Sequence, residues 1–141
     1  MSALRAYLTF SGNCREAMEF YRDCFGGSLY FQTLADGPRT RKLPAAMRKK
    51  ILHADLQAEN FSLVGSDITP GGGLQQGNTI SLLLQCKSIR TLRRQYRQLA
   101  GDKATRLPLA DGKQPLTTNL TDPFGINWIL FYPGKTAKQK Q

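Results

Sequence analysis

Apolar side chains recur at helical spacing between residues 14 and 25, directly after a short strand-like run at residues 4–10. The apolar face of this predicted helix consists of Cys14, Ala17, Met18, Tyr21, Cys24 and Phe25. Asn13 is placed to cap the first turn, Glu16 can complete a capping box, and Gly26–Gly27 allows a left-handed exit. The pattern therefore predicts a strand that turns directly into an amphipathic helix, whose apolar face packs on a sheet.

The remaining apolar and polar positions predict further strands and one more helix, which Ser88 caps and which ends near residue 100. The strands are expected at residues 28–34, 51–58, 61–66, 79–86, 105–109, 115–120 and 126–132. Both halves of the chain thus repeat the order strand, helix, strand, strand, strand, and each holds an Asp-Gly turn, at Asp36–Gly37 and Asp111–Gly112. A duplicated βαβββ unit predicts an α+β fold in which a curved mixed sheet encloses a cavity between the halves.

The length of 141 residues predicts a single domain, which we place at residues 1–134. Its two modules are expected at about residues 3–67 and 78–133, and residues 135–141 form a polar, basic tail that we expect to be disordered. No apolar run approaches the ~20 residues of a membrane span, and the three cysteines suit reduced thiols. The expected location is therefore cytoplasmic, without a membrane partner, and Cys14 is expected to be a small buried side chain.

The formal net charge of +10 raises the question of an anionic partner. Four arginines at helical spacing would form one basic face: Arg90, Arg93, Arg94 and Arg97. Like charges at these spacings repel, so this face is either simply solvated or relieved by an anion or a nucleic acid. Nucleic acid is the less favoured partner because the aromatic residues fall mainly at core spacing. The basic loop at residues 39–50 either closes over a site as a lid or only connects strands.

Four segments stand out along the chain, at residues 7–27, Ile51–Leu56, Leu63–Asp67 and Leu120–Trp128. Together they resemble the vicinal oxygen chelate superfamily, which includes glyoxalase I, bleomycin-resistance proteins, fosfomycin-resistance enzymes and extradiol dioxygenases. They look most like the PhnB-like branch, in the family's order, and the resemblance covers residues 4–133. It implies the glyoxalase/bleomycin-resistance fold of two βαβββ modules and a homodimer.

Enzymes of the superfamily hold a divalent metal with one side chain from each of four strands. By the resemblance, the four positions fall on Ala6, on Asp55 with His53 two residues earlier, on Asn78 or Thr79, and on Ile129. Ala6 and Ile129 have no group that binds a metal, and two ligands fall short of the three that a catalytic zinc-type site usually needs. We therefore expect no metal and no other cofactor. His53 and Asp55 remain the candidate catalytic residues, as an acid/base pair or a partial metal site, or they form a polar pair without chemistry.

The leading hypothesis is a PhnB-like, metal-independent protein whose cavity binds a small molecule, with an anionic one favoured by the net charge. The expected cavity residues are Ala6, Leu8, Phe10, His53, Asp55, Asn127, Ile129 and Phe131. Trp128 should point the other way and pack under a helix, because strand neighbours alternate faces. Two alternatives stay open: a metal-dependent lyase or dioxygenase of the glyoxalase type, and a nucleic-acid-associated basic protein. Some PhnB-like relatives have carried a methyltransferase label, but this chain has no glycine-rich strand-to-helix turn for a nucleotide cofactor.

Overall fold

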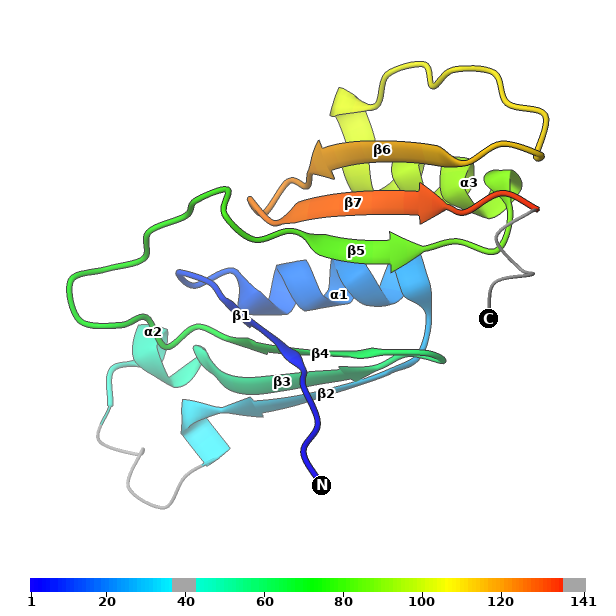
Figure 1. The fold of residues 1–141 in the computed structure, drawn as a ribbon. Coiled ribbons are helices and arrows are strands. Elements are labelled where there is room, and N and C mark those ends of the chain that lie inside the picture. Colours follow the sequence, from blue (N-terminus) through cyan, green and yellow to red (C-terminus); the bar gives the residue numbers. More distant parts are fainter. Residues whose placement is uncertain (37–42, 136–141) are drawn as a thin grey trace. The chain divides into compact units, whose positions relative to one another are not determined.

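A computed structural model describes residues 1–36 and 43–135 of the chain, and Figure 1 shows their course. The chain forms two compact units, Met1–Gln75 and Gln76–Gln141. Residues 37–42, which include the start of the predicted basic loop at residues 39–50, and residues 136–141, nearly all of the predicted tail, lie outside the described residues. Within the described part of the chain, no helix has the length and apolar character needed to cross a membrane.

The first unit is a four-stranded mixed sheet with one long helix, α1. Its elements are β1 (Ala6–Thr9), α1 (Cys14–Phe25), β2 (Ser28–Thr33), a 3₁₀ turn (Leu34–Asp36), α2 (Ala45–Arg48), β3 (Ile51–Gln57) and β4 (Ser62–Ser66). The strand order is β1-β4-β3-β2, in which β1 runs parallel to β4 while the other neighbours are antiparallel. The predicted helix at residues 14–25 and the predicted strands at residues 51–58 and 61–66 are confirmed, and the two strands pair as an antiparallel hairpin.

The core of the first unit lies between α1 and one face of this sheet. Cys14, Ala17, Met18 and Tyr21 of α1 are fully buried. Gly65 of β4 leaves room for them, since a side chain there would stand 3.0 Å from the Met18 sulfur and 3.1 Å from the Cys14 sulfur. The predicted apolar face of the helix therefore packs on the sheet as expected.

The start of α1 is held differently from the prediction. Asn13 makes no side-chain capping hydrogen bond, so the predicted capping box of Asn13 and Glu16 is wrong. Instead, the buried carboxylate of Asp67 accepts hydrogen bonds from the backbone N–H groups of Gly12 and Cys14, both at 2.9 Å. Helix N-termini need an acceptor for their free N–H groups, and here it comes from a residue just beyond β4.

The second unit repeats this arrangement with one strand fewer. Its elements are β5 (Leu82–Gln85), α3 (Ile89–Ala100), a 3₁₀ turn (Gly101–Lys103), β6 (Leu116–Thr121) and β7 (Asn127–Tyr132). The strand order is β5-β7-β6, with β5 parallel to β7 and β6 antiparallel to it. The predicted cap of α3 is confirmed, because the Ser88 hydroxyl accepts a hydrogen bond from the Thr91 N–H at 3.0 Å. The α+β class is likewise confirmed, although the strands form two separate mixed sheets.

The strand predicted at residues 105–109 is not formed. The Thr105 N–H donates to the Tyr96 hydroxyl at 3.1 Å, and Arg93 donates to the Pro108 carbonyl at 2.7 Å. Both bonds tie this segment to α3. Pro108 also lacks the N–H that a paired strand needs. Side-chain contacts with the helix thus replace strand pairing beside β6.

Candidate functional site

Strand register separates the first sheet into two chemically different faces. Leu8, Gly65 and Ala54 stand side by side across β1, β4 and β3, and Gly65 lies against α1. Neighbouring residues of a strand point to opposite faces. The next row, which consists of Tyr7, Val64, Asp55 and Tyr30, therefore lies on the face opposite α1. We call this the distal face and define it by Tyr7, Tyr30, His53, Asp55 and Gln57.

Asp55 is the centre of a polar cluster on the distal face. Its Oδ1 accepts hydrogen bonds from Arg5 Nη2 and from Gln57 Nε2, both at 2.7 Å. Arg5 Nε also donates to the Ser62 hydroxyl at 2.8 Å, which fixes the guanidinium in this position. His53 Nε2 stands 3.9 Å from Asp55 Oδ2, beyond hydrogen-bond distance. The structure thus brings the two predicted catalytic candidates together, and adds Arg5 between β1 and β3.

The ionisation of Asp55 follows from these contacts. Partial burial raises the pKa of the carboxyl, but the hydrogen bonds from Arg5 and Gln57 and the charge of Arg5 outweigh it. The pKa of Asp55 therefore lies below its usual value of 3.8. At neutral pH Asp55 is a carboxylate whose charge is balanced by Arg5, and it is poorly suited to act as a general acid.

The residues present do not fit the divalent metal that the superfamily resemblance implies. Ala6 stands in one row across the sheet with Leu63 and with Leu56, which is fully buried. Residues of one row point to the same face, so Ala6 lies on the α1 side of the sheet. The neighbouring side chain on the distal face is Arg5, a cation, which already binds Asp55. Within residues 1–36 and 43–135, no three histidine, cysteine, aspartate or glutamate side chains form a group that could hold a metal ion.

The structure divides the predicted cavity residues among different faces. Leu8 and Phe10 are 8% and 2% exposed, and strand alternation places them with Ala6 on the α1 side. Grouping these three with His53 and Asp55 on one face was therefore wrong, because the sheet itself lies between them. Tyr7 and Tyr30 stand on the distal face instead, at 59% and 66% exposure. The alternation of Leu8 and Phe10 with Tyr7 and Arg5 was the sequence signal that could have identified the correct face.

The predicted residues of the second unit do share a face of their sheet. Trp128 is 3% exposed, and its Nε1 donates to Asp122 Oδ2 at 2.9 Å. Helix α3 packs against β7, so the prediction that Trp128 points under a helix is confirmed. Asn127, Ile129 and Phe131 alternate with it and lie on the opposite face, partly exposed. A cavity that combines them with His53 and Asp55 stays a prediction.

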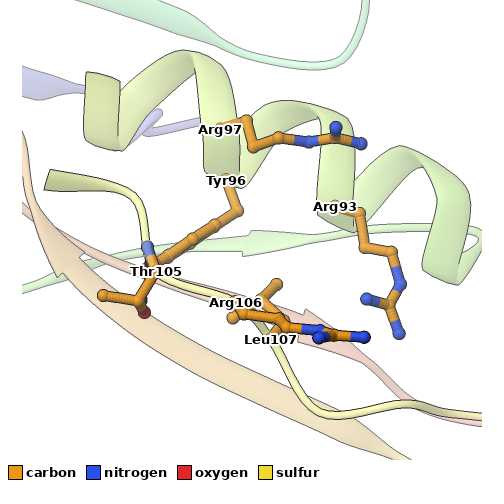
Figure 2. Close-up of a pocket in the computed structure, with 6 residues that line it drawn as sticks. All are labelled: Arg93, Tyr96, Arg97, Thr105, Arg106 and Leu107. Atoms are coloured by element: carbon orange, nitrogen blue, oxygen red, sulfur yellow. Dashed lines mark hydrogen bonds between the residues drawn. The ribbon is translucent and has the colours of Figure 1, made fainter. Parts of the chain in front are cut away.

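Two of the four arginines predicted as an anion-binding face line a pocket of about 230 Å³ in the second unit. These are Arg93 and Arg97, and a third arginine, Arg106, joins them from the segment after α3 (Figure 2). The other two, Arg90 and Arg94, do not line it. Sequence reasoning missed Arg106 because it assigned residues 105–109 to a strand.

The buried cysteines offer no reactive thiolate at neutral pH. Burial, assisted by the charge of Asp67, raises the pKa of the Cys14 thiol to about 12. Burial likewise raises the pKa of Cys86 to about 11, although the nearby Arg94 partly offsets it. The prediction that Cys14 is a small buried side chain is confirmed.

Comparison with known proteins gives matches over nearly the whole chain. The family model described as 3-demethylubiquinone-9 3-methyltransferase matches residues 2–131. Protein YjdN of Escherichia coli (strain K12) is 23% identical over 143 residues, which cover 90% of this chain and 92% of YjdN. The crystal structure of protein PA1353 from Pseudomonas aeruginosa gives a TM-score of 0.76 at 29% identity, covering 94% of this chain and 98% of that chain. A putative 3-demethylubiquinone-9 3-methyltransferase, PhnB protein, from Bacillus cereus gives 0.65 at 19% identity, covering 93% and 99%.

Proposed function

Because the chain belongs to the family described as 3-demethylubiquinone-9 3-methyltransferase, the PhnB-like group that its motifs predicted, we propose that it binds a small molecule without a resident metal. The distal face of the first sheet is the proposed binding surface. The observation that carries this proposal is the pair of 2.7 Å hydrogen bonds from Arg5 and Gln57 to one oxygen of Asp55. A carboxylate held in this way is already charge-balanced, so it attracts a metal ion less strongly than an unpaired carboxylate would.

The composition of the distal face supports a small organic ligand. Tyr7 and Tyr30 lie in the same row across the sheet as Asp55, and both residues are exposed, so each can supply apolar contact area and a hydroxyl. The His53 side chain is 45% exposed and can donate or accept a hydrogen bond. The net charge of +10 favours an anionic ligand over a cationic one.

We do not extend methyl transfer, the activity in the family's description, to this chain. A nucleotide-type cofactor is commonly held by free backbone N–H groups at a strand-to-helix turn. In the turn before α1, Asp67 already accepts the N–H groups of Gly12 and Cys14. The lyase or dioxygenase alternative needs a metal, so elemental analysis tests it directly.

Elemental analysis of the untagged protein, after incubation with nickel, zinc, manganese or iron(II) and desalting, tests the metal-independent part of the proposal. We expect well below one metal ion per chain in the wild type and in His53→Ala. About one metal ion per chain that is lost in His53→Ala would contradict the proposal and favour the metalloenzyme.

The binding surface is tested through His53, which is the only histidine among the 141 residues and gives a unique imidazole signal in proton NMR spectra. Small carboxylates and phosphomonoesters would be screened for shifts of this signal. His53→Ala should weaken a ligand found in this way at least about fivefold, roughly 1 kcal/mol, with unchanged thermal unfolding. Glu59→Ala, in the exposed β3–β4 turn, is the matched control and should leave the affinity unchanged. Equal affinities in the wild type and His53→Ala would move the site away from the distal face.

A further inference from the structure

The pocket lies between α3 and the segment at residues 105–107, and hydrogen bonds hold part of its lining in place. Tyr96 is 5% exposed, its hydroxyl lies 3.0 Å from the Thr105 hydroxyl, and it also accepts the Thr105 N–H at 3.1 Å. These bonds hold the segment with Arg106 and Leu107 against the helix. Arg93 is held in turn by its hydrogen bond to the Pro108 carbonyl at 2.7 Å. The walls of the pocket are therefore in place before any ligand arrives.

Three guanidinium groups gather at this pocket without a balancing negative charge. Arg93, Arg97 and Arg106 line it, and none of the six lining residues is acidic. Figure 2 shows Arg93 and Arg97 on α3 and Arg106 on the segment that follows the helix. Across residues 1–36 and 43–135, none of the three forms an ion pair with a carboxylate. Arg93 and Arg97 are four residues apart on α3, a spacing at which like charges repel and destabilise the helix. An anion in the pocket would relieve this repulsion.

We propose that this arginine pocket binds the phosphoryl group of a small phosphorylated molecule. A phosphoryl group presents about two negative charges and three acceptor oxygens, and the planar fork of arginine binds such oxygens in pairs. Arg93 uses one N–H group in its hydrogen bond to the Pro108 carbonyl. Each guanidinium has five N–H donors, so all three arginines have N–H groups left for a ligand. A carboxylate has only two oxygens and would leave more of this donor set unpaired.

The size and walls of the pocket favour a small phosphomonoester over a nucleic acid. Its volume of about 230 Å³ lies below the range of roughly 300–1,000 Å³ that is typical of drug-sized sites. Leu107 offers a short apolar wall for the part of the ligand that carries the phosphate. Single-stranded nucleic acid needs exposed aromatic rings for stacking, and the aromatic residue of this pocket, Tyr96, is buried and hydrogen-bonded.

Isothermal titration calorimetry of the full chain with inorganic phosphate and with ribose 5-phosphate, at constant ionic strength, tests this proposal. We expect both to bind in the millimolar range or tighter, about −4 kcal/mol or better. Tighter binding of ribose 5-phosphate would identify a phosphomonoester as the occupant, and equal binding would identify free phosphate. Absence of binding by both would overturn the proposal.

Variants that each remove one positive charge separate the pocket from general charge. Arg97→Gln and Arg106→Gln should each weaken phosphate binding at least about tenfold. Arg90→Gln lies on the same helix outside the pocket and should change the affinity by less than about twofold. Arg106→Gln lies outside α3, so it keeps the test valid if Arg97→Gln disturbs the helix.

Equal losses in all three variants would show an effect of net charge and overturn the site. Tight, steeply salt-dependent binding of an oligonucleotide that Arg90→Gln and Arg97→Gln weaken equally would assign the arginines to a nucleic acid instead. The proposal concerns the second unit alone, so its failure would leave the binding surface at His53 untouched.

Discussion

Gly27 joins α1 to β2 with its backbone at φ +101°, a conformation that side chains with a Cβ rarely adopt. A Cβ at this position would collide with the backbone oxygen of Gln57 and stand 2.9 Å from Ala58 Cα at the end of β3. Gly12, before α1, has a similar φ of +108° but has no atom within 4 Å of such a Cβ. The two glycines therefore share a backbone requirement, and only Gly27 is also required by close packing.

Replacing each of these glycines with alanine separates the two requirements. Gly12→Ala should lower the free energy of unfolding by about 1 kcal/mol, because it only strains the backbone. Gly27→Ala should lower it by roughly 3 kcal/mol or more, because the backbone of β3 cannot move aside cheaply. Urea unfolding followed by circular dichroism measures both. Equal losses would mean that the α1–β2 connection shifts to accommodate the methyl group.

Membership of the proposed binding surface also depends on single positions in a strand. Arg5 reaches Asp55 across the sheet, whereas its neighbour Ala6 faces α1. Strand alternation has a period of two, so an assignment that is wrong by one residue exchanges the two faces completely. The predicted set of Ala6, Leu8 and Phe10 failed for this reason, while His53 and Asp55 were placed together correctly.

At the scale of elements, one buried aspartate in each unit holds neighbouring elements together, Asp67 across many residues of the chain and Asp122 within a few residues of its own position. Asp67 accepts from the N–H groups of Gly12, Cys14 and Ile51, each at 2.9 Å, and so links the start of α1 to β3 and β4. Asp122 has a similar role between β6 and β7, where it accepts from the N–H groups of Phe124 and Ile126 and from the indole of Trp128. Both carboxylates are 3% exposed. Both of these boundaries are thus held by hydrogen bonds to a carboxylate, and such bonds are stronger than hydrogen bonds between two neutral groups.

Removing the Asp67 carboxylate should be costly. Asp67→Ala leaves three backbone N–H groups without their acceptor, and we expect the free energy of unfolding to fall by at least about 3 kcal/mol. Hydrogen exchange should also accelerate first in the initial turn of α1. Asp23→Ala, which removes a carboxylate that is 75% exposed at the other end of the same helix, should change the stability by less than about 0.5 kcal/mol. A similar small loss for Asp67→Ala would mean that water replaces the carboxylate and that Asp67 does not hold the helix in place.

At the scale of the whole molecule, the two units have the same topology. In each, the first strand runs parallel to the last, and the preceding strand pairs antiparallel with that last strand. The element order that suggested a duplication is therefore repeated in the sheet pairing. The sheet of the second unit has one strand fewer, because Tyr96 and Arg93 hold residues 105–108 against α3.

We expect the protein to form a homodimer. Large apolar side chains are exposed on both units, among them Tyr7, Tyr30, Ile80 and Leu83, and an interface would cover part of this surface. Sedimentation velocity should give a species of twice the chain mass of 15.7 kDa at micromolar concentration. Leu83→Ser and Tyr30→Ser identify which unit contributes the interface, because the variant at the interface should dissociate on dilution. A single species with the mass of one chain at every concentration would contradict the prediction.

How much could be predicted depended on how far apart the interacting residues lie. Helix α1, the Ser88 cap of α3 and the buried side of Trp128 were predicted correctly, since each depends on neighbours within a few positions along the chain. The family assignment likewise follows from local motifs, which occur in order along nearly the whole chain.

Apart from the strand expected at residues 105–109, the sequence by itself therefore determined the main elements, their order and the family, because hydrophobic periodicity acts over one or two turns of backbone. Tertiary structure alone decided what completes each site. Asp67 replaces the predicted cap of α1 from 53 residues away, and Arg5 binds Asp55 across 50 residues. Arg106 meets Arg93 and Arg97 only because Tyr96 holds the segment after α3 in place. Such contacts depend on which strands pair and on competition between partners in space, and both act between residues that lie far apart along the chain.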